Sequence, residues 1–234
     1  MGEGKKFLIG GDSWGMGVWN DKADSEYQVV HTGFNKLLED TGYTVHNCCQ
    51  SNSSNKDSIR RLASLVNREY TKGDIVIWIQ SDPTRDLRGI DMTTALLDAG
   101  TPKQLVKNIL NQNYKQLNLI DKPIYAVGGL CNLDIELLRL YNNIKAFVPS
   151  WVYLLVNNLY PEVSERTVLG DVACNVKDID LNKFTKEQRM LLVDELHEMN
   201  ETKHFYVNEM FKPDYRHPNL EGHRILFKEI EKLL

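Results

Sequence analysis

Short apolar runs alternate with amphipathic stretches along this chain, and glycine or polar residues close each apolar run. The run Ile75-Val76-Ile77-Trp78-Ile79 is continuous, which is typical of a strand covered by helices on both faces. Shorter apolar runs predict four further strands, at residues 6–10, 43–46, 124–127 and 146–148.

Apolar residues at three-and-four spacing predict helices between these runs. The predicted helices span residues 24–40, 55–70, 102–119, 133–141, 151–159, 186–199 and 220–234. This alternation indicates an α/β fold, a three-layer α/β/α sandwich around a five-stranded parallel sheet. Because no linker or repeat interrupts the pattern, we expect a single domain over residues 1–234, with a less regular segment at 160–212.

Composition and charge narrow the range of functions. The 234 residues are 42% hydrophobic, which is ample for a buried core, and the formal net charge is −4, so nucleic acid is an unfavourable partner. No run reaches the roughly 18–20 apolar residues that span a bilayer, and no secretory signal is recognisable. We therefore expect a cytoplasmic protein with reduced cysteines and no membrane partner. The sequence leaves the oligomeric state open.

Polar loops follow the first three predicted strands, where open parallel sheets bind their ligands. The first loop, Gly11-Asp12-Ser13-Trp14-Gly15, presents a serine on a tight turn. Near the end of the chain, Asp214 and His217 are three residues apart, close enough for the carboxylate to hold the imidazole. The pattern predicts a triad in which Ser13 is the nucleophile, His217 the base and Asp214 the orienting acid.

Two other kinds of site receive less support from the sequence. His204, Asp214 and His223 are metal-binding residue types, but they lack the tight grouping of zinc ligands. The loop after the first strand contains one serine, whereas a flavodoxin-type phosphate loop is rich in Ser and Thr. We therefore expect no metal and no cofactor, and a nucleotide or flavin binder is the least favoured alternative.

These motifs resemble those of the SGNH, or GDSL-like, hydrolase superfamily. The resemblance rests on Gly11-Asp12-Ser13 after the first strand and on Asp214-x-x-His217 before the last helix, continued by Pro218-Asn219-Leu220-Glu221-Gly222-His223. Residues 50–55 and 147–151 are also similar to SGNH-like proteins that tailed phages encode, for which the host cytoplasm would be the location. The resemblance implies a flavodoxin-like fold and the activity of a metal-free serine esterase, a class that includes deacetylases. Its substrate would be an acyl ester of a small molecule or saccharide.

Two loops depart from the pattern of that family. Asn52 stands where the family has a glycine whose N–H helps to bind the oxyanion. In the loop after the third strand, the family has an asparagine whose side chain also contacts the oxyanion, whereas this chain has Ser81-Asp82-Pro83-Thr84-Arg85. The resemblance thus makes Asn52, Ser81, Asp82 and Arg85 candidates for binding the oxyanion or the substrate. Ser81 offers one hydroxyl donor, an ionised Asp82 would repel an oxyanion, and Arg85 suits an anionic group. The altered loop also motivates a second hypothesis, an SGNH-fold binding or structural protein with weak or no turnover.

Overall fold

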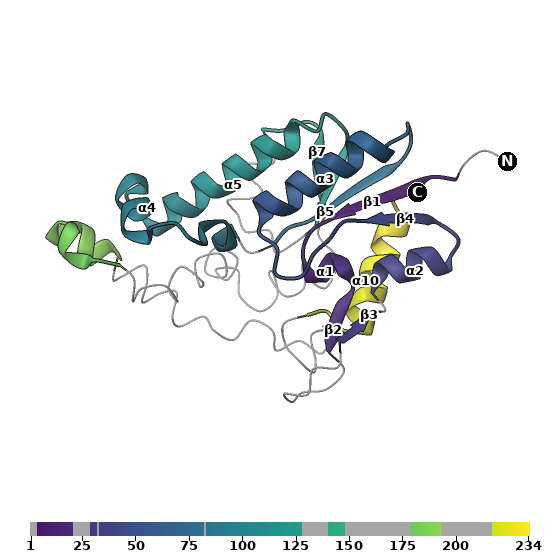
Figure 1. Cartoon of the computed structure of the whole chain (residues 1–234), viewed down its shortest axis with the longest axis horizontal. Helices are drawn as coiled ribbons and strands as arrows, with labels where there is room; N and C mark the ends of the chain where they lie inside the picture. Colours follow the sequence, from purple (N-terminus) through teal and green to yellow (C-terminus); the bar gives the residue numbers. More distant parts are fainter. Residues whose placement is uncertain are drawn as a thin grey trace.

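A parallel sheet of five strands forms the middle layer of the fold, with helices on either side (Figure 1). The computed structural model describes residues 4–20, 29–31, 33–81, 83–127, 140–147, 179–192 and 217–234. The strands of the sheet are β1 (Lys6–Gly10), β4 (Thr44–Asn47), β5 (Ile75–Ile79), β6 (Ile124–Val127) and β7 (Ile144–Phe147). Their order is β4-β1-β5-β6-β7, and all neighbours are parallel. Counted along the chain this is 2-1-3-4-5, the order of flavodoxin-like folds, so the predicted fold class is confirmed.

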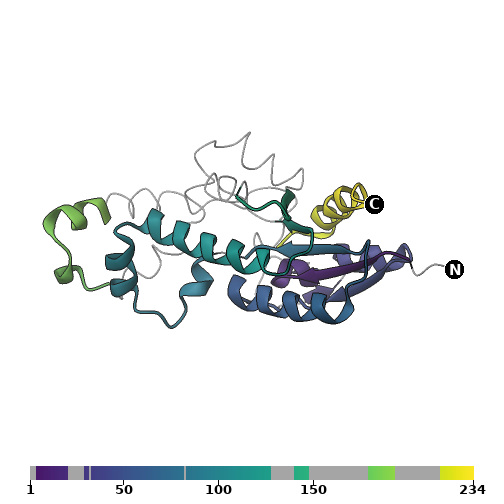
Figure 2. The same ribbon diagram turned by 90° about the horizontal axis from the view of Figure 1, so that it is seen from above.

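Helices cover both faces of the sheet, because successive residues of a strand point to opposite sides. The α-helices are α1 (Ser13–Met16), α2 (Phe34–Asp40), α3 (Asn55–Glu69), α4 (Met92–Ala99), α5 (Pro102–Asn118) and α10 (Leu220–Glu231). On β5, Val76 and Trp78 are buried with the apolar residues of α3 and α5. Ile75 and Ile77 are buried on the other face with those of α2 and α10. Figure 2 shows α3 and α10 on opposite sides of the sheet, as a three-layer sandwich requires.

The structure corrects some of the predicted elements. Residues 29–31 are not helical but form β3 (Val29–His31), which pairs antiparallel with β2 (Val18–Asn20). Adjacent β-branched valines favour this strand, and α2 begins only after Gly33. Leu140 and Tyr141 are likewise not helical. The predicted helical residues 24–28, 133–139, 151–159 and 193–199 lie outside the described residues.

Three short elements after β5 were not predicted from the apolar periodicity: η1, α4 and η4. The 3-10 helix η1 (Pro83–Leu87) leads towards α4, whose first turn is capped by Asp91 through a 3.0 Å bond from the N–H of Thr93. A second 3-10 helix, η4 (Leu181–Lys183), precedes a helical stretch at residues 186–192. None of the described helices combines the length and apolar character that a bilayer crossing requires.

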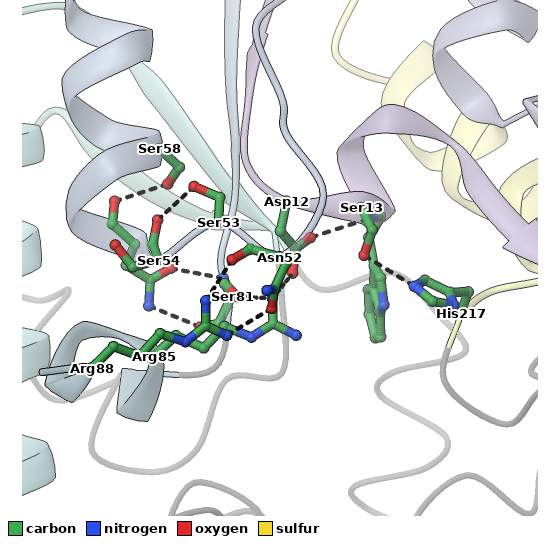
Figure 3. Close-up of polar contacts among 12 residues, drawn as sticks. Asp12, Ser13, Asn52, Ser53, Ser54, Ser58, Ser81, Arg85, Arg88 and His217 are labelled. Atoms are coloured by element: carbon green, nitrogen blue, oxygen red, sulfur yellow. Dashed lines mark hydrogen bonds and ion pairs between the residues drawn. The ribbon is translucent and has the colours of Figure 1, made fainter.

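The loops after β1, β4 and β5 meet at the carboxyl edge of the sheet. Beyond the last residue of β4, the N–H of Cys48 still bonds to the carbonyl of Ile9 at 2.8 Å, and the N–H of Gln50 bonds to that of Gly11 at 3.2 Å. The pairing of β4 with β1 therefore continues into their loops. This brings the segment that ends at Asn52 alongside Asp12 and Ser13 (Figure 3).

Candidate active site

Ser13 is the first residue of α1, a single helical turn directly after β1. Asp12 caps this turn by accepting a 3.1 Å hydrogen bond from the N–H of Trp14. The turn ends at Gly17, whose φ of 71° lies in the left-handed region that favours glycine. Gly11 has no space for a side chain, because a Cβ there would lie 2.6 Å from that of Ile79. These constraints hold Ser13 in a tight strand-to-helix turn, where its side chain is largely buried.

His217 reaches Ser13 from the other end of the chain. Its Nε2 lies 3.0 Å from the Oγ of Ser13, although the two residues are 204 positions apart (Figure 3). His217 precedes α10, whose first turn is capped by Asn219 through a 3.1 Å bond from the N–H of Gly222. At this distance a neutral imidazole can accept the hydroxyl proton of the serine. Asp214, the predicted third member of the triad, lies outside the described residues.

Asn52 has an uncommon backbone conformation. Its φ is 61°, and Asp121 is the other non-glycine residue with a positive φ in the described part of the chain. Asparagine tolerates this left-handed region better than most non-glycine residues. The N–H groups of Ser13 and Asn52 have no acceptor among the described residues.

Arg88 contacts Asn52 through both ends of its guanidinium group. Nη1 donates to the backbone carbonyl of Asn52 at 2.8 Å, and Nη2 donates to its Oδ1 at 2.7 Å (Figure 3). Arg88 was not predicted from the sequence, because an exposed arginine beyond the candidate loop has no local feature that distinguishes it from ordinary surface charge.

A buried asparagine joins the loop after β5 to the start of α3. Asn55 is fully buried, its Nδ2 donates to the carbonyl of Ser81 at 2.9 Å, and its Oδ1 accepts from the N–H of Ser81 at 2.7 Å. Both backbone polar groups of Ser81 are thereby satisfied by one side chain. This pair of bonds positions Ser81 beside the serine loop.

Arg85 and Ser81 converge on the carboxylate of Asp12. Nη1 of Arg85 lies 3.0 Å from Oδ2 of Asp12 and 2.7 Å from Oγ of Ser81. Burial raises the pKa of Asp12, and the charge of Arg85, with hydrogen bonds from Trp14 and Ser81, counteracts part of this rise. The hydroxyl of Ser81 is thus engaged, whereas no described residue accepts from Nε or Nη2 of Arg85. Asp82 lies outside the described residues.

Replacing Arg85 by methionine should destabilise the protein by about 1–2 kcal/mol at pH 8, because the buried carboxylate of Asp12 loses its cation. The expected cost is below that of a fully buried pair, since the side chain of Arg85 is 28% exposed. The folded protein binds the Asp12 proton more tightly than the unfolded chain, so stability falls as pH rises through the raised pKa. In urea unfolding, Arg85→Met should therefore lower the free energy of unfolding by less at pH 4.5 than at pH 8.

The exposed Arg68, on the last turn of α3, provides the matched control. Its replacement by methionine should cost less than about 0.5 kcal/mol. An Arg85→Met penalty of equal size at pH 8 and pH 4.5 would show that the pair does not act through the charge of Asp12.

His223 lies within α10, six positions beyond His217, and its side chain is fully buried. Its ring stacks on that of Phe34, with centroids 6.1 Å apart and an interplanar angle of 26°. Neither ring nitrogen has a hydrogen-bond partner among the described residues. Burial, with a smaller effect from His217, lowers the pKa of His223 to about 3. This histidine is therefore neutral at physiological pH.

The described residues contain no group of three or more His, Cys, Asp or Glu side chains that could hold a metal ion. Cys48 and Cys49 are both free thiols. Burial raises the pKa of Cys49 well above its usual value, which disfavours the reactive thiolate. Among the described residues of the site, Ser13 and His217 are a hydroxyl and an imidazole within hydrogen-bond distance of each other.

Comparisons with known proteins find distant structural likenesses. No protein-family model and no curated protein matches the chain. The psychrotrophic esterase EstA from Pseudoalteromonas sp., in a structure inhibited by monoethylphosphonate, is 12% identical with a TM-score of 0.48, over 98% of this chain and 96% of that chain. TesA is 18% identical with a TM-score of 0.42, over 97% of each chain.

A mutant of Axe2, an acetylxylan esterase from Geobacillus stearothermophilus, is 16% identical with a TM-score of 0.38, over 99% of this chain and 94% of that chain. All three TM-scores lie below 0.5. The fold class is therefore taken from the strand order of the chain itself.

Proposed function

We propose that this protein is a serine esterase of the SGNH type. The observation that carries the proposal is the 3.0 Å contact between Ser13 Oγ and His217 Nε2, made between residues that the motif pattern had singled out independently. The short turn at the carboxyl end of β1 holds the serine, and the segment before α10 holds the histidine. Both lie at the sheet edge where parallel α/β folds bind their ligands.

The reaction follows from this pair of side chains. Ser13 Oγ attacks the ester carbonyl while His217 Nε2 takes the hydroxyl proton, and the histidine then passes that proton to the departing alcohol. A water molecule, deprotonated by the same histidine, attacks the acyl-enzyme and releases the carboxylic acid. In this proposal Asp214 accepts a hydrogen bond from Nδ1 of His217, which keeps Nε2 directed at the serine.

The developing negative charge on the carbonyl oxygen requires hydrogen-bond donors. The N–H groups of Ser13 and Asn52 support this role, because no described residue accepts from them. Ser81 is less suitable, since its hydroxyl is hydrogen-bonded to Asp12 and accepts from Arg85. Arg85 has the remaining donors, and we assign to it the third contact with the oxyanion or with an anionic part of the substrate. The substrate class is an acyl ester of a small molecule or saccharide.

Labelling with a fluorophosphonate probe tests the proposal. Such a probe phosphonylates an activated serine, so the wild-type protein should be labelled and the Ser13→Ala and His217→Ala variants should not. Labelling lost in both variants supports the esterase and justifies a screen of acetyl and longer acyl esters. If well-folded wild-type protein is not labelled, the esterase proposal fails and the non-catalytic binding protein becomes the better hypothesis.

A further inference from the structure

A local turn and a side chain from another loop both hold the conformation of Asn52. A φ of 61° is unfavourable for a residue with a Cβ, even for asparagine. Asn52 is also exposed, so close packing does not enforce this conformation. A 3.2 Å bond from the N–H of Ser53 to the carbonyl of Gln50 closes a turn with Asn52 in its third position. The two hydrogen bonds from Arg88, at 2.8 and 2.7 Å, hold Asn52 itself in this turn.

The guanidinium group suits this task for a geometric reason. Its two terminal nitrogens form a rigid planar fork, and the two acceptors are the backbone carbonyl and the side-chain oxygen of one residue. The carbonyl direction depends on the backbone torsion after the Cα of Asn52, and the Oδ1 position depends on its side-chain torsions. Holding both at once restricts the backbone and the side chain of Asn52 together. A lysine, with a single ammonium group on a flexible stem, cannot hold two acceptors in the same way.

Arg88 itself projects from a segment that is firmly attached to the fold. Leu87 is buried in the core cluster with α3 and α5. Asp86 accepts a 2.9 Å bond from the N–H of Lys56, at the start of α3, and a 2.8 Å bond from Nδ2 of Asn113, on α5. The base of the Arg88 side chain is therefore fixed relative to the helices on one face of the sheet.

We propose that Arg88 is a positioning residue for catalysis, which holds Asn52 in the left-handed conformation so that its N–H is directed at the oxyanion. This inference rests on the proposed function and assigns a role to a residue outside the triad. A glycine at position 52 would adopt this conformation without help. Asparagine is held in it by the contacts with Arg88. The N–H of Asn52, with no described acceptor, is the group that Arg88 orients.

A double-mutant cycle between positions 88 and 52 tests this proposal, with kcat and KM measured on 4-nitrophenyl acetate. Arg88→Ala should lower kcat about ten-fold with KM within about two-fold, since complete loss of one oxyanion donor costs about 10²–10³. Arg88→Lys should give an intermediate kcat. In the Asn52→Gly background, whatever its own kcat, Arg88→Ala should cause no further loss, because glycine adopts a positive φ without a clamp.

The cycle separates positioning from the other roles that an exposed arginine can have. If Arg88→Ala lowers kcat by the same factor in both backgrounds, or raises KM instead, Arg88 does not act through Asn52 and the inference is overturned. An unchanged kcat in Arg88→Ala also overturns it. Arg68→Ala, which removes an exposed arginine at the far end of α3, is the charge-matched control and should leave both constants unchanged.

The wild-type measurement distinguishes failure of this inference from failure of the proposed function. A wild-type protein that neither hydrolyses the ester nor reacts with fluorophosphonate refutes the esterase and, with it, the catalytic role of Arg88. An active wild-type protein whose cycle shows no coupling refutes the role of Arg88 alone. Thermal unfolding of each variant identifies any loss of kcat that comes from unfolded protein.

Discussion

Ser13→Ala and His217→Ala are each expected to lower kcat for ester hydrolysis by about 10⁴-fold or more, and the double variant should be no worse than either. The serine and histidine act as a unit, because the 3.0 Å contact between Oγ and Nε2 carries the proton in the same step that forms the new bond. Once one partner is absent, the other has nothing to activate. Steady-state kinetics on an activated acetyl ester, with the three variants at equal concentration, measure this non-additivity.

Two substitutions serve as matched controls for this experiment. Ser64 is an exposed serine on α3, and His46 lies on the edge strand β4. Ser64→Ala and His46→Ala should keep kcat within about two-fold, because surface substitutions away from a site rarely matter. Independent, multiplicative losses for Ser13→Ala and His217→Ala would contradict a shared role in one step.

His223→Phe should make the protein markedly more resistant to acid. The pKa of His223 is about 3 in the folded protein against 6.5 as its ordinary value. Between these two pH values the imidazole is protonated in the unfolded chain but neutral in the folded protein, so the free energy of unfolding falls as pH falls. At 1.36 kcal/mol for each pH unit, the wild-type protein should lose about 2–3 kcal/mol between pH 7 and pH 4.5 through this residue alone.

Urea unfolding of the wild type and of His223→Phe at both pH values measures the effect. Phenylalanine keeps an aromatic ring against Phe34 and has no proton to bind. A difference in packing changes the free energy of unfolding by the same amount at both pH values. The part of the difference between the two proteins that depends on pH therefore reports the titration of His223. Equal pH dependence in the two proteins would mean that the buried imidazole is protonated at little cost.

The neutral state of His223 also affects the proposed chemistry. A positive charge at this position would oppose the formation of the imidazolium at His217, because the two rings interact electrostatically. Burial without a hydrogen-bond partner among the described residues keeps His223 neutral and avoids that repulsion. In the proposed mechanism, His217 therefore accepts the proton next to a neutral rather than a charged neighbour.

The sequence by itself determined the architecture and the pair at the centre of the site. The limits of β1, β5 and β6 match the predicted runs, since continuous apolar segments between glycines and polar residues have few other ways to be buried. Ser13 and His217 were identified from short motifs at the ends of a strand and a helix. Their meeting follows from a topology in which strand ends collect at one edge.

The tertiary structure alone decided how the site is held together. Nothing local in the sequence places Arg88 on Asn52 or Arg85 on Asp12, pairs that lie 36 and 73 positions apart. Local sequence likewise predicted a helix where the valines of β3 pair with β2. Apolar periodicity reports which face of an element is buried, whereas the partners of polar side chains depend on which loops the fold brings together. The contact between Ser13 and His217 could therefore be predicted, but the contacts that Arg88 and Arg85 make around it could not.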